Sequence, residues 1–229
     1  MKILRAIGVI TSTLLIYLGI TLLGWGINDI QGFFSNPTRA VYAVIVACFA
    51  MLVGIQAYHS LAGIQDGKDE IGKRIRRQSI VGSLLVLFLL VSFILIPYTS
   101  RRELSIFPSL VFLSWLGVLF CTVGYLLIFW SGLTLGRQYS AEVTIQKDHQ
   151  LITTGPYHLI RHPRYLGILL VGFGYSLLFH SWLGLVFTAT AKGLILFRIR
   201  DEEELMHKHF GNAWEEYCRQ SWRLFPYLF

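Results

Sequence analysis

The sequence predicts an all-α, polytopic membrane protein with about six transmembrane helices, a C-terminal helical hairpin and cytoplasmic C-terminal helices. Three observations support this fold class. Apolar residues make up 54% of the 229 positions and charged residues only 14%, too few to solvate the surface of an ordinary soluble domain. The apolar residues form blocks long enough to cross a hydrocarbon core of about 30 Å, which takes roughly 20 helical residues. Basic residues cluster between alternate blocks, as they do at the cytoplasmic ends of membrane helices.

Four apolar blocks in the first part of the chain meet this length requirement. They run from about Ala6 to Ile27, Ala40 to Ile64, Ile80 to Tyr98 and Ser109 to Leu135. Lys2 and Arg5 precede the first block, as basic residues precede a secretory signal, but the block is longer than a signal core and lacks a small-residue cleavage pattern. We therefore predict a transmembrane region of four helices over residues 1–135, and we expect it to act mainly as a scaffold.

The fifth apolar stretch, Tyr165–Ile199, is too long for a single crossing. As one straight helix it would measure about 50 Å at 1.5 Å per residue. The polar His180-Ser181-Trp182, followed by Gly184, is the expected turn. It divides the stretch into two helices joined as a hairpin, which brings the expected total to six.

Residues 136–229 are predicted to form the catalytic region, because the composition becomes polar after Leu135. A polar re-entry segment leads to Pro163 and the hairpin, and two cytoplasmic helices are expected after the hairpin. Gly211 can take the left-handed conformation that ends the first of them. Asn212, with Glu215 three residues later, resembles a capping box that starts the second.

The distribution of the +7 net charge predicts the orientation. With a cytoplasmic N-terminus, the basic residues at 2–5, 68–77 and 137–164 and those after Arg198 all lie in the cytoplasm, while Arg39, Arg101 and Arg102 lie outside. Both termini are then cytoplasmic, and nucleic-acid binding is a poor explanation of the charge. The three cysteines lie in separate elements without metal-ligand spacing, so we expect neither a disulfide framework nor a metal.

The first candidate site residues lie between Thr154 and Tyr165. Pro156 and Pro163 each favour a helix start, which places His162 at a helix N-terminus. Free backbone N–H groups and the helix dipole favour a bound anion there. The alternative is that His162 only caps its own helix and that Tyr165 only anchors the membrane interface.

A second candidate set is acidic. Glu202 and Glu203 follow Arg198 directly after an apolar helix, at spacings that allow simple surface salt bridges. Because the hairpin returns the chain to the side where it began, however, we expect these carboxylates to lie near the His162 segment. Lys192, inside the last apolar helix, is expected to face a cavity or a partner, or else to extend its ammonium group to the interface.

Several motifs in this region together resemble the isoprenylcysteine carboxyl methyltransferase family and its bacterial relatives. They are Gly155-Pro156-Tyr157, Arg161-His162-Pro163-Arg164-Tyr165, the apolar hairpin and Glu202-Glu203, and the similarity extends from Leu135 to Pro226. The resemblance implies an S-adenosylmethionine-dependent methyltransferase of a bacterial inner membrane, acting on a carboxylate or thiol of a lipophilic, for example isoprenoid, substrate that enters from the bilayer. The sequence departs from the common family pattern at Trp214 and Trp222.

The resemblance also implies roles for individual residues. Arg161, Arg198 and Glu202 are expected to act on the substrate. Cofactor contacts are expected from Gln138, Leu151, Ile152, Thr153, Tyr157, His162, Tyr165 and Glu203. Membrane lipids are the other expected partners, and no metal ion or nucleic acid is expected.

Three alternatives stay open on the sequence. The run from Arg200 to Tyr227 also resembles NADPH-dependent membrane sterol reductases, although the chain is short for one. A transporter would need polar residues along several helices, and the first four blocks offer few. In a non-enzymatic scaffold the grouping of the basic, His and acidic motifs would be accidental. The identity of the methyl acceptor, and whether oxygen, sulfur or nitrogen is methylated, are not decided by the sequence.

Overall fold

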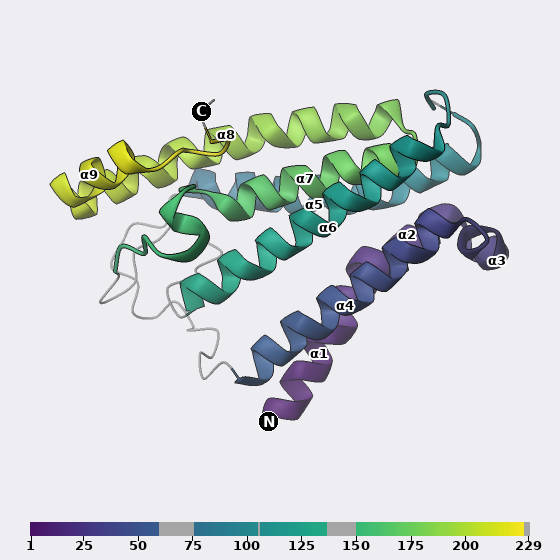
Figure 1. Ribbon diagram of the computed structural model, residues 1–229, viewed down its shortest axis with the longest axis horizontal. Coiled ribbons are helices and arrows are strands. Elements are labelled where there is room, and N and C mark those ends of the chain that lie inside the picture. Colours follow the sequence, from purple (N-terminus) through teal and green to yellow (C-terminus); the bar gives the residue numbers. More distant parts are fainter. Residues whose placement is uncertain (60–75, 105, 137–149, 227–229) are drawn as a thin grey trace.

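The computed structural model describes residues 1–59, 76–104, 106–136 and 150–226, and these residues are almost entirely helical (Figure 1). Among them no β-strand is present, and strand-like pairing is limited to two isolated bridges, Ile106 with Ser181 and Ile160 with Trp222. The all-α prediction is confirmed.

The helices follow one another in the order that the apolar blocks indicate. They are α1 (Lys2–Leu14), a π-helical segment (Leu15–Gly19), α2 (Ile20–Trp25), a 3-10 segment (Ile27–Asp29), α3 (Ile30–Phe34), α4 (Pro37–His59), α5 (Arg76–Arg101), α6 (Val111–Leu135), a second 3-10 segment (Gly155–His158), α7 (Pro163–Leu178), α8 (Trp182–Phe210) and α9 (Asn212–Gln220).

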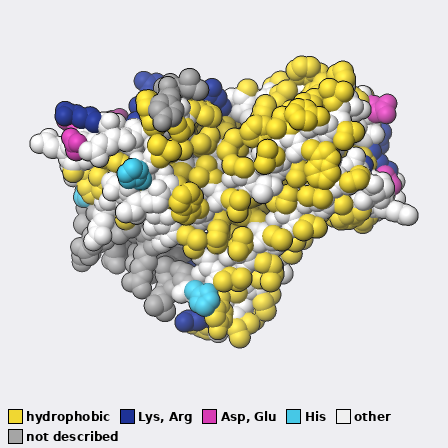
Figure 2. Space-filling view, in the orientation of Figure 1, with side chains coloured by type: hydrophobic (Ala, Val, Ile, Leu, Met, Phe, Trp, Pro, Cys, Tyr) yellow, Lys and Arg dark blue, Asp and Glu magenta, His cyan; other side chains and the backbone are white. Residues whose placement is uncertain are grey.

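Five of the helices in the described part of the chain are long and apolar enough to cross a membrane. They are Lys2–Trp25, Pro37–His59, Val81–Arg101, Val111–Leu135 and Trp182–Phe210. α7 is apolar but has only 16 residues, or about 24 Å of helix. Figure 2 shows hydrophobic side chains over most of the visible face and charged ones toward its edges, as lipid exposure requires. The protein is therefore an integral membrane protein, and a sixth crossing by α7 stays a prediction.

The expected hairpin is present, with its turn at the predicted place. α7 ends at Leu178 and α8 begins at Trp182, and His180 between them has a φ of 50°, the left-handed conformation of a tight turn. The Ser181 side chain caps α8 by accepting a 3.1 Å hydrogen bond from the Gly184 N–H. In Figure 1 the turn lies at the right, so that the start of α7 and the end of α8 lie together at the left.

The expectation of a separate cytoplasmic helix directly after the hairpin is wrong. α8 continues as one helix of 29 residues through the acidic segment to Phe210, because no glycine or proline interrupts it after Ile199. The helix ends at Gly211, with a φ of 51°, as predicted. The capping box is not formed: α9 has no side-chain cap, and Glu215 instead pairs with His207 of α8 at 3.0 Å.

Close backbone contact fixes α7 against α6. A Cβ atom at Gly124 would lie 2.7 Å from the carbonyl oxygen of Gly167, and one at Gly167 would lie 2.8 Å from that of Gly124. Next to this contact, a buried apolar cluster joins α5, α7, α8 and the chain after α9: Leu85, Ile160, Leu166, Leu169, Ala191, Ile195, Ile199 and Leu224. This packing holds the start of α7 and the end of α8 in a fixed relation, which positions the polar side chains described next.

Candidate functional site

The start of α7 is clamped to the segment that follows α9. The backbone N–H of Arg161 donates to the carbonyl of Trp222 at 2.7 Å, and that of His162 donates to the carbonyl of Arg223 at 3.2 Å. The N–H of Trp222 returns a bond to the carbonyl of Leu159 at 2.9 Å. These bonds bring the C-terminal segment alongside the motif that contains His162.

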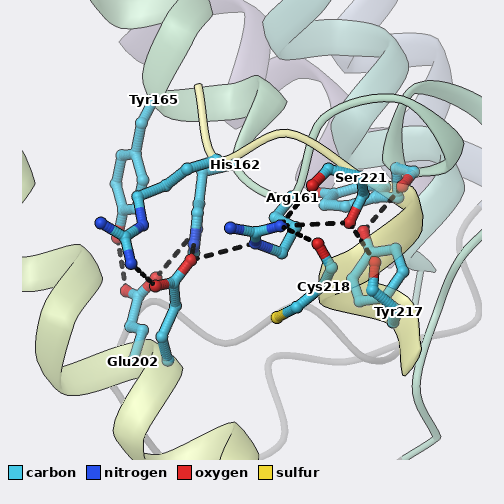
Figure 3. A network of polar contacts seen from close by, with 10 residues as sticks. Arg161, His162, Tyr165, Glu202, Tyr217, Cys218 and Ser221 are labelled. Carbon is cyan, nitrogen blue, oxygen red and sulfur yellow. Dashed lines mark hydrogen bonds and ion pairs between the residues drawn. The ribbon is translucent and has the colours of Figure 1, made fainter. Parts of the chain in front are cut away.

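Glu203 of α8 is the centre of the first half of the site, with contacts to Arg161 and His162, both of which Figure 3 labels. Its Oε1 accepts a hydrogen bond from Nε of Arg161 at 3.1 Å and lies 3.3 Å from Nε2 of His162. Its Oε2 lies 2.6 Å from Nη2 of Arg223. Both carboxylate oxygens thus have close partners, and the side chain is only 12% exposed.

Glu202, Tyr165 and Arg198 form the second half. Nε of Arg198 donates to the Tyr165 hydroxyl at 2.7 Å and to Oε1 of Glu202 at 3.0 Å. The Tyr165 hydroxyl donates to the same Glu202 oxygen. The other oxygen, Oε2, lies 3.7 Å from Nδ1 of His162, which is longer than a normal hydrogen bond.

The His162 imidazole joins the two halves. Its Nε2 faces Glu203, its Nδ1 faces Glu202, and its ring stacks on that of Tyr165 with centroids 5.8 Å apart. His162 is the N-cap residue of α7, but its side chain makes no capping bond. The alternative that it only caps its own helix is therefore wrong.

Arg161 also binds the C-terminal segment. Its Nη1 donates to the carbonyl oxygen of Cys218 at 3.2 Å, to the carbonyl oxygen of Ser221, and to Oγ of Ser221 at 3.4 Å. Figure 3 shows this guanidinium between the carboxylates on one side and the carbonyl groups on the other. Its orientation is fixed from both sides.

We call the set Arg161, His162, Tyr165, Arg198, Glu202, Glu203 and Arg223 the polar cluster. The side chains of Arg161, His162 and Arg198 are each 10% exposed. Burying a charge in this way is costly unless the charge is paired and hydrogen-bonded, and each carboxylate here faces cationic partners. A buried arrangement of this kind can recognise charged and polar groups of a ligand, because few of its contacts are with water.

Tyr157 and Tyr217 hold the 3-10 segment before α7 in place. The Tyr217 hydroxyl of α9 donates to the carbonyl oxygen of Tyr157 at 2.6 Å. Burial raises the pKa of Tyr217 to about 12, so this hydroxyl keeps its proton at neutral pH. Burial also raises the pKa of Tyr157. The expected contact of Tyr157 with a cofactor stays a prediction.

The structure brings together six of the residues that the sequence singled out: Arg161, His162, Tyr165, Arg198, Glu202 and Glu203. Leu151 and Ile152 are half-buried and Thr153 is exposed on the approach to the 3-10 segment, and Gln138 lies outside the described residues. Lys192 is exposed on α8.

Sequence reasoning did not select Arg223 or Ser221. Arg223 lies within the stretch that resembles the methyltransferase family, but no local pattern showed that it would reach Glu203. The adjacent glutamates Glu202 and Glu203 are a signal that could have indicated a further cation such as Arg223, since each buried carboxylate needs cations nearby.

Known proteins share both sequence and fold with this chain. The family model described as the isoprenylcysteine carboxyl methyltransferase (ICMT) family matches residues 115–208. A probable protein-S-isoprenylcysteine O-methyltransferase of Oryza sativa subsp. indica is 30% identical over 162 residues, which cover 67% of this chain and 84% of the relative. A protein-S-isoprenylcysteine O-methyltransferase of Dictyostelium discoideum is 27% identical over 143 residues, 54% of each chain.

Two further likenesses bear on the fold and on the reductase alternative. The solved structure of the eukaryotic intramembrane Ras methyltransferase ICMT matches with a TM-score of 0.51 and 18% identity, covering 96% of this chain and 98% of that one, so the two share a fold. A Delta(14)-sterol reductase of Mus musculus is 36% identical over 87 residues, which are 35% of this chain but only 20% of the reductase.

Proposed function

This chain belongs to the isoprenylcysteine carboxyl methyltransferase family, and from this premise we propose that it uses S-adenosylmethionine to methylate a carboxylate or thiol of a lipophilic substrate. The chain is an integral membrane methyltransferase. The observation that carries the proposal is that His162 of α7 lies within 3.3 Å of Glu203 and 3.7 Å of Glu202 of α8, although these residues are far apart in the sequence.

The chemistry of the polar cluster fits this cofactor. S-adenosylmethionine carries a carboxylate, an ammonium group and a sulfonium group, and the cluster offers guanidinium groups for the first and carboxylates for the other two. Oε2 of Glu202 lies 3.7 Å from Nδ1 of His162, which is beyond hydrogen-bond distance. This oxygen is therefore the acceptor best placed for a positively charged group, while Glu203 holds Arg161 and Arg223 in position.

When bound, the cofactor supplies a methyl group on a positively charged sulfur, and transfer to a carboxylate requires no proton from the protein. The work of this chain is therefore to bind, orient and exclude water. Holding two reactants at near-attack distance can account for about 7–11 kcal/mol of the barrier. Arg198, held by Tyr165 and Glu202, and Arg161, held by Glu203, are the groups that we expect to order the substrate.

The substrate class follows from the relatives and from the membrane. The relatives named above are protein-S-isoprenylcysteine O-methyltransferases, and we propose that this chain also takes an isoprenoid-bearing carboxylate. Such a substrate partitions into lipid, so it reaches the polar cluster from the bilayer. We propose that the cluster and both termini lie on the cytoplasmic side; Lys2 and Arg5 at the start of α1 and Arg76 and Arg77 at the start of α5 support this orientation.

Cofactor binding by the purified, detergent-solubilised protein tests the proposal. We expect S-adenosylmethionine to raise the melting temperature of the wild type, because a ligand that binds only the folded state stabilises it. His162→Ala and Glu203→Gln should weaken binding, measured by calorimetric titration. Glu204→Gln is the matched control, because this neighbouring carboxylate is 64% exposed and pairs with Lys208 on the surface.

Two results would count against the proposal. Unchanged affinity in both His162→Ala and Glu203→Gln would remove the polar cluster from the cofactor site. Stabilisation by NADPH, with none by S-adenosylmethionine, would instead favour the sterol reductase alternative.

A further inference from the structure

Gly82 of α5 lies directly against the polar cluster, although α5 belongs to the region that the sequence predicts as a scaffold. A Cβ atom at Gly82 would lie 2.6 Å from Nη1 of Arg198 and 3.9 Å from its Cζ. Among the described residues, these are the atoms that a side chain at Gly82 would meet within 4 Å beyond its own surroundings in the helix. The guanidinium of Arg198 therefore occupies the space that any other residue at this position would fill.

The packing of α5 on α8 makes this contact fixed. Val81 and Leu85 of α5 are 9% and 6% exposed, and Ile195 and Ile199 of α8 are fully buried. Leu85, Ile195 and Ile199 belong to one apolar cluster, which sets the distance between the two helices. These side chains hold the two backbones apart. The space beside Gly82, which the Arg198 guanidinium occupies, is therefore a feature of the packed interface and does not depend on a flexible loop.

We propose that Gly82 is a positioning residue of the methyltransferase site: its missing side chain forms a notch that holds the Arg198 guanidinium. This inference rests on the proposed function, in which Arg198 orders the substrate. In the notch, Nη1 points at α5 while Nε bonds the Tyr165 hydroxyl and Glu202 at 2.7 and 3.0 Å. A planar guanidinium that is fixed at both positions keeps one orientation in the site.

The kind of atom that an added Cβ would meet decides whether a substitution moves one side chain or shifts a helix. At Gly124 and Gly167 an added Cβ would meet backbone atoms, which cannot move without shifting a helix. At Gly82 it would meet the tip of a long side chain, which can swing away. A methyl group at Gly82 should therefore displace the guanidinium and leave the helices in place.

The first experiment compares Gly82→Ala with Gly193→Ala in steady-state methylation. Gly193 of α8 is the matched control, because a Cβ atom there would meet nothing within 4 Å. With an S-farnesylated N-acetylcysteine as the acceptor, we expect Gly82→Ala to lower kcat/KM for the acceptor by about tenfold to a hundredfold, as misplacement by about 1 Å can. Its melting temperature should fall less than that of Gly82→Val, its affinity for S-adenosylmethionine should fall by a smaller factor than its kcat/KM for the acceptor, and Gly193→Ala should match the wild type in all three.

The second experiment needs no activity and tests the contact itself. Gly82→Val should lower the melting temperature of the otherwise wild-type protein, because two more methyl groups exceed what the side chain of Arg198 can avoid. In an Arg198→Ala background, with the guanidinium gone, the same change should have little effect. A double-mutant cycle of this form isolates the pairwise interaction.

The outcomes separate this inference from the proposed function. Equal kinetics for Gly82→Ala and Gly193→Ala, or equal losses of melting temperature for Gly82→Val in both backgrounds, would overturn the notch. A wild-type protein that neither binds S-adenosylmethionine nor methylates the acceptor would contradict the proposed function, and the unfolding cycle would still decide whether Gly82 positions Arg198.

Discussion

Replacing Glu203 by glutamine removes the charge that holds both the His162 motif and the C-terminal segment. In the wild type this carboxylate lies 3.1 Å from Nε of Arg161, 3.3 Å from Nε2 of His162 and 2.6 Å from Nη2 of Arg223. The glutamate side chain is 12% exposed and that of Arg161 10%, so little water can replace the lost partner. Breaking a buried pair from one side typically costs about 3–5 kcal/mol.

We expect Glu203→Gln to lie at the lower end of this range, at about 3 kcal/mol, since glutamine has the same shape and keeps a hydrogen-bond acceptor. The measurement is the free energy of unfolding in mixed micelles titrated with a denaturing detergent. Arg223→Gln should cost less, because Arg223 is 33% exposed and water can solvate what remains.

The double variant Glu203→Gln with Arg223→Gln isolates the pair. The two changes should be less destabilising together than their sum, by about 0.5–3 kcal/mol, as for other directly contacting residues. Glu204→Gln, one residue further along α8, should change the unfolding free energy by less than about 0.5 kcal/mol. A Glu203→Gln variant as stable as Glu204→Gln would refute the reasoning, because Glu203 would then not be the anchor of a buried charge network.

Three further predictions concern other contacts and the orientation of the helices. Tyr217→Phe removes the hydrogen bond to the Tyr157 carbonyl and should lower the free energy of unfolding by about 1 kcal/mol. Because folding raises the pKa of the Tyr217 hydroxyl to about 12, the wild type should lose stability as the pH rises from about 10 toward about 12. The variant, which lacks this hydroxyl, should not show that loss. Ser181→Ala removes the cap of α8 and should cost about 1 kcal/mol by the same measurement. In a background without Cys48, Cys121 and Cys218, Arg5→Cys should react with an impermeant maleimide only in inside-out vesicles, and Arg102→Cys only in right-side-out vesicles. The reverse pattern would contradict the cytoplasmic orientation.

The membrane fold could be predicted because its signals are local and physical. The stretch Tyr165–Ile199 exceeds the bilayer, and the turn falls at His180, where polar residues interrupt it. The meeting of His162 with Glu203 follows from this one turn, because a hairpin returns the chain to the face it left. Most of the polar cluster can therefore be predicted from the sequence.

The parts that could not be predicted depend on contacts between elements. Nothing near Arg223 in the sequence indicates that its side chain reaches Glu203, since this requires the chain to reverse after α9 and pair with Ile160. In the sequence Gly82 is an ordinary glycine of an apolar helix. The positioning role proposed for it depends on its contact with the Arg198 guanidinium of α8. The change from apolar to charged residues after Ile199 predicts the end of a helix, but α8 continues through the charged residues to Phe210.

The balance of charge in the polar cluster bears on which acceptor is methylated. Three guanidinium groups, on Arg161, Arg198 and Arg223, face two carboxylates, on Glu202 and Glu203. With its two carboxylates engaged by the arginines and the cofactor, a largely buried site with this excess of positive charge favours an anionic acceptor over a cationic amine, because screening by water is weak there. Among the acceptors compatible with entry from lipid, we therefore expect a carboxylate or thiolate. Methylation removes the negative charge that the arginines hold, so the neutral product should bind more weakly than the substrate and return to the bilayer.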